Sequence, residues 1–427
     1  MDLDALIARR TFIAELRGEH PEVVCGRVAA ASEVGARVVD STGWILVAGV
    51  ALRPGDWVVV EGTLGRNGIL LATRSTVATP YRKAGHFGSP GDEFVRLSPR
   101  LGRLALRDKA MQAVRAFFHQ RGFIEVETPL MVPSPGLELH LDAVTADDKF
   151  LITSPEYQLK RVLAGGADKV FSICRCFRRG ERGPHHNPEF TMIEWYRAWA
   201  GYEAIMADTE ELVAAVARAV LGTTHARPPD STDGGAGLEL APPWERITVG
   251  GAMLRWAGFA VNGDETAADL LARARTAGLA MSGIDDRSPW DDVFFAAFLE
   301  AVEPQLGQGR PTIVYEWPAP LAALARHKPG DPRVVERFEA YAGGLELCNA
   351  FGELTDPAEQ RRRFKKDLAD RAARKKPLYP VDMKFLAALD EGLPPCAGIA
   401  LGIDRLMMLL LGAPDIRDVV AFTADEL

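Results

Sequence analysis

The sequence predicts an α+β protein in which a small five-stranded barrel precedes a larger domain of mixed strands and helices. Between residues 23 and 78, short strand-like runs alternate with turn signals, a spacing typical of small barrels. Beyond residue 98, long helical periodicities alternate with two hairpin patterns, at 170–196 and 333–351. A chain of 427 residues has room for two or three such domains.

The composition narrows the class of protein. The chain is 47% hydrophobic and 25% charged, and its net charge of −8 argues against a general nucleic-acid coat while allowing a local basic site. Its five cysteines form no CxxC pair, so neither a zinc site nor a disulfide framework is indicated. The start lacks the basic and apolar regions of a signal peptide, and no run of eighteen apolar residues occurs. We therefore expect a cytoplasmic protein that does not enter a membrane.

The first domain, residues 1–80, is expected to hold a short charged helix within residues 1–20 and an OB-like β-barrel. The five strand-like runs are 23–29, 36–40, 44–50, 56–64 and 69–77. Barrels of this type often bind oligonucleotides, which requires a basic groove with stacking rings. Through residue 95, however, 10 Lys and Arg stand against 11 Asp and Glu, and few aromatic residues fall on the runs. RNA binding by this module is therefore the less favoured alternative, and docking of a protein substrate stays open.

A linker at 81–98 leads to the second domain, 99–427, which carries a surface insertion at about 223–243. The stretch 101–121 predicts an amphipathic helix, followed by a strand that ends at a proline. A later helix is expected to begin with Ser154 as N-cap and Pro155 in its first turn. On this pattern alone, Glu156 is expected to complement the helix dipole.

The hairpin at 170–196 carries the densest set of functional side chains. In its second strand, Phe190, Met192, Glu194 and Tyr196 share one face, and a packed core would not include Glu194 without a partner. The loop supplies cations that suit a polyphosphate: Arg178, Arg179, Arg182, His185 and His186. A solvated basic hairpin explains the same charge count, and the downstream motifs decide between the two.

The hairpin at 333–351 turns at a Gly-Gly pair, which favours a primed turn. Counting outward places Tyr341 opposite Glu346, so that Glu339 and Glu346 lie diagonally on one face. Two carboxylates that close repel unless a cation neutralises them, and Mg²⁺ carried by a nucleotide suits both. Regular alternation puts Asn349 and Glu353 on the opposite face, unless the strand bends near 350–352.

A third motif lies near the C-terminus, where a glycine-bearing strand leads into an apolar helix. Gly402 lets another group approach the backbone closely, with Asp404 near the cap and Arg405 in the first turn. An Arg beside a helix N-terminus adds positive charge to a positive potential. An anion is therefore expected there, and phosphate is the natural candidate.

These stretches, in this order, resemble the three motifs of class II aminoacyl-tRNA synthetases. The matching residues are Thr128-Pro129, the run from Phe177-Arg178 to Glu194, and Gly402-Ile403-Asp404-Arg405. Within that class, 154–161, 186–192 and 337–353 are similar to the lysyl branch, and the resemblance covers about residues 98–427. It implies an antiparallel sheet flanked by helices, ATP bound in a bent form across it, and activation of a carboxylate to an adenylate.

Two subfamilies share such a catalytic domain: lysyl-tRNA synthetases, and paralogues that attach (R)-β-lysine to a lysine of translation elongation factor P. Glu194-Trp195-Tyr196-Arg197 and the ending 418–423 resemble the second subfamily. Ala400 also resembles the second subfamily, because lysyl-tRNA synthetases have Gly at this position. The synthetases likewise have Gly at the position of Cys348. Added side-chain volume at the pocket is expected to disfavour α-lysine. The barrel, which those paralogues usually lack, favours instead a synthetase that charges tRNA, and a non-catalytic sensor of amino acid or nucleotide is the third alternative.

The resemblance also implies roles for individual residues. Arg178 and Arg405 are implied to bind the ATP phosphates and to be catalytic, while Glu339 and Glu346 hold Mg²⁺. The implied ATP site comprises Arg178, Arg179, Gly180, Glu181, His186, Asn187, Phe190, Glu339, Glu346, Leu347, Gly402 and Arg405. The implied amino-acid site comprises Ser154, Pro155, Glu156, Glu194, Tyr196, Asn349, Glu353 and Ala400.

Within these sets the resemblance is more specific. Phe190 is expected to stack on adenine, and Glu156, Tyr196 and Glu353 to bind the terminal ammonium of the amino acid, leaving the other amine to Glu194 and Asn349. Arg179-Gly180 stands where the family usually has Asn-Glu, so either Glu181 or backbone groups are expected to contact adenine. The Pro129 motif implies a homodimer, elongation factor P is the expected partner, and tRNA is the less expected one.

Overall fold

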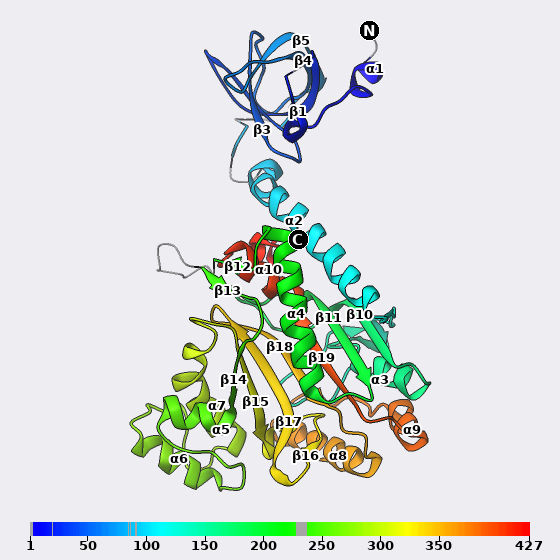
Figure 1. Cartoon of the computed structure of the whole chain (residues 1–427), viewed down its shortest axis with the longest axis vertical. Helices are drawn as coiled ribbons and strands as arrows, with labels where there is room; N and C mark the ends of the chain where they lie inside the picture. The colour runs from blue at the N-terminus through cyan, green and yellow to red at the C-terminus, as the bar shows by residue number, and fades with distance from the viewer. Residues whose placement is uncertain (1–2, 19, 84, 86, 90–91, 228–236) are drawn as a thin grey trace. The chain divides into compact units, whose positions relative to one another are not determined.

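The computed structural model describes residues 3–18, 20–83, 85, 87–89, 92–227 and 237–427 (Figure 1). It divides into two compact units, Met1–Leu106 and Arg107–Leu427. The predicted insertion at about 223–243 contains the short strands β12 (His225–Ala226) and β13 (Leu238–Glu239). The segment between them, 228–236, lies outside the described residues, as do residues 84, 86, 90 and 91 of the predicted linker.

The first unit contains a closed five-stranded barrel with the strand order β1-β2-β3-β5-β4, which confirms the OB-like prediction. Its strands are β1 (Glu22–Ser32), β2 (Gly35–Val39), β3 (Trp44–Ala48), β4 (Trp57–Leu64) and β5 (Ile69–Thr79). Alternate residues point inward, so Val24, Val38, Val47 and Val60 are fully buried in its core. The strand-like runs and turn signals therefore predicted the five strands.

Two helical predictions near the N-terminus were wrong in extent. The first helix, α1 (Leu3–Ile7), is shorter than predicted because the chain after it bonds to the first strand of the barrel, where the Thr11 N–H donates to the Val23 carbonyl. Helix α2 (Glu93–Gln120) begins eight residues before the predicted start at 101. The carbonyl of Asp92 accepts hydrogen bonds from the first turn, and Pro99 inside the helix removes only its own N–H donor.

The second unit is built on one large sheet of order β14-β15-β17-β18-β19-β11-β10-β6, with β16 paired to β17. The central pairs are antiparallel, as predicted, and parallel pairs occur at the two edges, β14–β15 and β10–β6. The strands are β6 (Ile124–Glu125), β10 (Lys169–Phe177), β11 (Glu189–Ala198), β14 (Glu245–Thr248), β15 (Thr312–Pro318), β16 (His327–Lys328), β17 (Asp331–Ala342), β18 (Leu345–Gly352) and β19 (Cys396–Gly402).

Helices flank this sheet (Figure 1). Helices α4 (Tyr202–Leu221) and α10 (Ile403–Leu411) contact its central strands, and α3 (Glu156–Ala164) contacts β10 and β11. The other helices are α5 (Val249–Ala252), α6 (Ala267–Thr276), α7 (Trp290–Ala301), α8 (Pro357–Ala373) and α9 (Met383–Glu391), and the short strands β7 (Met131–Val132), β8 (Thr145–Ala146) and β9 (Lys149–Leu151) form a separate sheet. Along the central strands, buried apolar residues alternate with polar ones, so one face of the sheet packs in the hydrophobic core and the other presents polar side chains.

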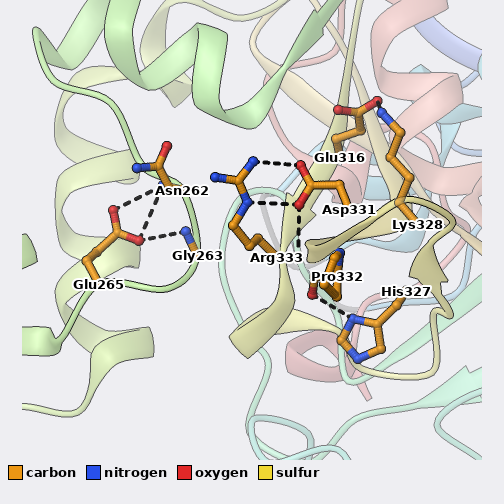
Figure 2. Close-up of polar contacts among 9 residues, drawn as sticks. All are labelled: Asn262, Gly263, Glu265, Glu316, His327, Lys328, Asp331, Pro332 and Arg333. Atoms are coloured by element: carbon orange, nitrogen blue, oxygen red, sulfur yellow. Dashed lines mark hydrogen bonds and ion pairs between the residues drawn. The ribbon is translucent and has the colours of Figure 1, made fainter.

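Figure 2 shows the polar contacts around the start of β17, where this strand meets β15 and β16. Glu316, in a bulge of β15 with φ of +59°, accepts a hydrogen bond from the Lys328 ammonium at 2.5 Å. The remaining contacts are Arg333 to Asp331, His327 to the Pro332 carbonyl, and the backbone of Asn262 and Gly263 to Glu265. None of the nine residues drawn is a predicted site residue. Most of these contacts join near neighbours in the sequence, so they order the local backbone.

Candidate active site

One row of side chains crosses five strands of the large sheet on a single face. Strand pairing places Glu339 opposite Asn349, Asn349 opposite Ala400, Ala400 opposite Glu194, and Glu194 opposite Ser172. Residues directly opposite each other share a face of a sheet. Four of these five residues were predicted site residues, and the row brings them together from hairpins far apart in the sequence.

A β-bulge at Leu347 explains why regular alternation failed here. Tyr341 pairs with Glu346, as predicted, but Ala340 pairs with Cys348, so Leu347 is the extra residue of β18. The offset returns Asn349 to the face of Glu339 and Glu346. The predicted separation of Glu346 from Asn349 was therefore wrong, and no bend near 350–352 is required.

The bulge also settles the position of Cys348. Its pairing partners are Ala340 and Leu401, one residue out of step with the row that contains Ala400. Its side chain therefore lies on the apolar face and is buried there. The expectation that Cys348 adds volume to the substrate pocket was wrong, whereas Ala400 lies between Asn349 and Glu194.

Glu339 lies in a polar cluster at one end of the row. Its carboxylate accepts a hydrogen bond from the Arg337 guanidinium at 2.5 Å and another from the Tyr341 hydroxyl at 2.7 Å. Burial raises the pKa of Glu339 to about 7, a shift that Arg337 opposes and the charge of Glu346 reinforces. The two predicted metal ligands therefore interact electrostatically, as the sequence argument required.

Arg405 connects the third motif with the hairpin at 333–351 and with the loop of the second motif. Its guanidinium donates to the Glu346 carbonyl at 2.9 Å, lies 3.3 Å from the Glu346 carboxylate and contacts the His186 ring at 2.6 Å. Next to it, Asp404 accepts from the Thr191 N–H and forms an ion pair with Arg107 at 2.6 Å. Asp404 thus joins the start of α10, which carries Arg405, to β11 and α2.

The loop of the second motif places Arg178 near Phe190. The guanidinium carbon lies 5.0 Å from the centre of the ring, and Glu181 lies 3.8 Å from the same guanidinium. Gly180 has φ of +82°, a conformation that favours glycine where the family usually has Glu. The Arg179 N–H donates to the Asp142 carbonyl, so this loop is tied to a segment near 136–142.

His186 and Asn187 lie at the other end of that loop. Burial and the neighbouring Arg405 lower the pKa of His186, which favours the neutral ring. The Asn187 amide is already used inside the chain, because it donates to the Glu189 carbonyl and accepts from the Ala424 N–H. Together with Arg182, Asp415 and Thr423 these two residues line a cavity of about 180 Å³.

The predicted ammonium pocket contains a lysine that the sequence argument missed. The Lys160 ammonium lies 2.5 Å from a carboxylate oxygen of Glu156 and 2.5 Å from one of Glu353. Both Lys160 and Glu353 are buried, and burial raises the pKa of Glu353 to about 8 against the opposing charge of Lys160. Lys160 follows Glu156 by one helical turn, a spacing that could have identified the pair in advance.

Glu194 and Tyr196 lie beside these carboxylates. The Ser154 hydroxyl donates to Glu194 at 2.5 Å and the Tyr196 hydroxyl donates to it at 3.0 Å. Burial first, and then the charge of Glu156, raises the pKa of Glu194 well above its usual range. The N-cap of α3 is Pro155, so the prediction of Ser154 at that position was wrong by one residue, although the Ser154 hydroxyl accepts a hydrogen bond from the Glu156 N–H at 3.1 Å.

Two further residues of this region were not predicted. Gly398 pairs with Tyr196, and a Cβ at Gly398 would overlap the Tyr196 ring, so only glycine admits the ring there. Glu138 carries a carboxyl whose pKa burial raises to about 7, with Glu156 adding to the shift. Its segment is fixed by the fully buried Arg371 of α8, which donates to the Glu138 carbonyl at 2.8 Å. Neither position had a motif to mark it.

The described residues contain no group of three or more His, Cys, Asp or Glu side chains that could hold a metal ion alone. Glu339 and Glu346 are two carboxylates on one face, which fits Mg²⁺ that takes its other oxygens from phosphate and water. Gly402, the N-cap of α10, leaves open space for such a ligand, since the nearest atoms to a Cβ there belong to Arg405 at 3.9 Å. Across the part of the chain that the structure describes, no helix is long and apolar enough to span a membrane.

Comparisons with known proteins agree with this geometry. The chain matches the family of tRNA synthetases class II (D, K and N) over residues 96–426. An elongation factor P–(R)-β-lysine ligase of Klebsiella pneumoniae (strain 342) is 40% identical over 341 residues, which cover 77% of this chain and 97% of the relative. A protein of the same name from Salmonella typhi is 39% identical with the same coverage. A lysine–tRNA ligase of Moorella thermoacetica is 41% identical over 323 residues, which cover 74% of this chain and 64% of the relative.

Proposed function

The chain belongs to the class II tRNA synthetases (D, K and N), and from that premise we propose that it activates (R)-β-lysine with ATP and transfers it to a lysine of elongation factor P. The observation that carries the proposal is Ala400: it lies between Asn349 and Glu194 in the row, so its methyl group would stand beside the two residues that we assign to an amine of the substrate. The ligase relatives support it further, because nearly their whole length aligns with this chain.

The phosphate chemistry is assigned to Arg178 and Arg405. The carboxylate of the amino acid attacks the α-phosphorus of ATP, the bond to the β-phosphate oxygen breaks, and pyrophosphate leaves. The two guanidinium groups stabilise the charge that develops on the phosphate oxygens. Phe190 offers a ring for adenine, and His186, whose pKa is lowered by burial and by the adjacent Arg405, adds a hydrogen-bond donor or acceptor.

Binding of the amino acid is assigned to the carboxylates beside the row. Burying an unpaired ammonium is costly, and Glu156 and Glu353 together with the Tyr196 hydroxyl supply oxygen partners for it. Glu194 and the buried amide oxygen of Asn349, which has no hydrogen-bond partner among the described residues, suit the second amine. The amino group of (R)-β-lysine is shifted by one carbon, which leaves room for the Ala400 methyl.

Mg²⁺ is assigned to Glu339 and Glu346, and when bound it supplies neutralisation of the phosphate charge. In the transfer step, the amine of the acceptor lysine attacks the adenylate carbonyl carbon. A C–N bond forms, the bond to the AMP oxygen breaks, and the amine loses a proton. No covalent bond to the enzyme is needed.

We also infer a homodimer. Large apolar side chains around the Pro129 motif are exposed, with Ile124 at 60%, Leu130 at 39% and Met131 at 48%. A second copy of the chain that covers these side chains would remove apolar surface from water. Measurement of the molar mass in solution tests this assembly.

Charging of tRNA with α-lysine is the second candidate function, and the N-terminal barrel favours it. A non-catalytic sensor is separated from both enzymes by assaying AMP formation with the parent and with Arg178→Ala. The parent is expected to form AMP when amino acid and acceptor are present, and the variant to lose about 100-fold or more of that rate. Equal rates in the two proteins would refute the role assigned to Arg178, and a parent that forms no AMP would refute the enzyme.

A further inference from the structure

Lys160 is a cation built into the predicted ammonium pocket. It projects from α3 into the protein, its side chain has no exposed surface, and its ammonium contacts Glu156 and Glu353 at 2.5 Å each. The Phe385 ring lies 5.9 Å from the same nitrogen. A buried lysine held by two such contacts has a fixed position in the pocket.

The charge state of Lys160 follows from its partners. Burial lowers the pKa of a lysine, but the charges of Glu156 and Glu353 outweigh burial and raise the pKa of Lys160 above its usual range. Lys160 is therefore an ammonium at neutral pH and is no nucleophile.

The contacts of Lys160 also decide which oxygen remains available. Its ammonium forms an ion pair with Oε2 of Glu353 at 2.5 Å, although this contact lacks hydrogen-bond geometry, and Oε1 has no hydrogen-bond partner in the described part of the chain. That free oxygen lies 2.7 Å from the position of a Cβ at Gly398, where the Tyr196 ring also packs. A fully buried acceptor oxygen needs a hydrogen-bond donor, and an ammonium group would supply one.

We propose that Lys160 is a positioning residue for the amino-acid substrate: it fixes Glu156 and Glu353 and leaves Glu353 Oε1 to bind the substrate ammonium. This inference rests on the proposed function. It differs from a purely structural role, in which the two ion pairs only stabilise the packing of α3 against the sheet. Under the proposed role, loss of Lys160 weakens binding of the amino acid much more than it slows chemistry.

The test is Lys160→Met, which keeps the length of the side chain and removes its charge. Adenylate formation is followed by ATP–pyrophosphate exchange with (R)-β-lysine and with α-lysine. The KM for the amino acid is expected to rise about thirtyfold or more, with kcat and the KM for ATP changed far less. The matched control is Lys328→Met, which removes an ion pair of the same 2.5 Å length at the turn in Figure 2 and is expected to leave both constants unchanged.

A second variant separates positioning from folding. Lys160→Ala deletes a propylammonium-sized part of the side chain, so added propylammonium is expected to restore a low KM while 1-propanol does not. If Lys160→Met is not recovered folded, Lys160→Arg carries the same test, because a planar guanidinium cannot reproduce both contacts.

The outcomes are distinct. An unchanged KM in Lys160→Met, or equal rescue of Lys160→Ala by the amine and the alcohol, overturns the role of Lys160 while the parent enzyme stays active. A parent that exchanges pyrophosphate with neither form of lysine overturns the proposed function itself.

Discussion

Ala400→Gly is expected to reduce the preference for (R)-β-lysine. Adjacent strands lie about 4.8 Å apart, so the Ala400 methyl stands about 5 Å from the Cβ atoms of Asn349 and Glu194, its neighbours in the row. Its removal opens room for an amino group at the α-carbon. One methyl group in such a pocket changes discrimination by about 1–3 kcal/mol, or about 10–200-fold.

The assay is pyrophosphate exchange with each isomer, and the quantity compared is the ratio of the two kcat/KM values. Glycine in a strand also costs about 0.5–1 kcal/mol of stability, which Ala397→Gly controls for. Ala397 is buried in the same strand but lies on the opposite face, so that change is expected to leave the ratio alone. An unchanged ratio in Ala400→Gly, or an equal shift in both variants, would refute the steric argument.

Three further predictions test separate parts of the site. Arg405→Lys replaces the guanidinium group, which contacts both the carbonyl and the carboxylate of Glu346, by a single ammonium charge. The kcat for adenylate formation is therefore expected to fall about 100-fold, while circular dichroism shows an intact fold. The pKa of Glu138 is raised to about 7, so its carboxyl increasingly destabilises the folded state as the pH rises from about 4.5 through 7. Glu138→Gln is therefore expected to match the stability of the parent at pH 4. At pH 8 the variant is expected to be more stable by up to about 3 kcal/mol in urea titrations. Equal stability differences at both pH values would contradict the burial of that carboxyl. Gly398→Ala displaces the Tyr196 ring and is expected to cost about 1–3 kcal/mol in urea titrations and to raise the KM for the amino acid; a variant as stable as the parent would contradict the close packing.

Much of this architecture could be predicted because local patterns and tertiary structure agree. The turn signals and alternation of the barrel gave strands close to those observed, such as 69–77 against β5 (Ile69–Thr79). The Gly-Gly turn fixed the pairing of Tyr341 with Glu346. In both cases the side-chain period and the turn residues determine the register without help from distant parts of the chain.

The parts that were missed depend on backbone irregularities or on distant neighbours. A single extra residue at Leu347 reverses the face of every later side chain in β18, and no residue type marks such a bulge. The need for glycine at 398 becomes visible only when Tyr196 of another strand lies opposite. The burial of Lys160 depends on its ion pair with Glu353, which lies almost 200 residues away in the sequence.

The most direct test of the central claim is the choice of acceptor. The enzyme is incubated with ATP, labelled (R)-β-lysine or α-lysine, and either elongation factor P or bulk tRNA, and the products are weighed by intact mass spectrometry. The account predicts a mass increase of one lysyl residue on elongation factor P, strongest with (R)-β-lysine, and no label on tRNA. Label on tRNA with none on the protein would contradict it and would identify the barrel as a reduced tRNA-binding module.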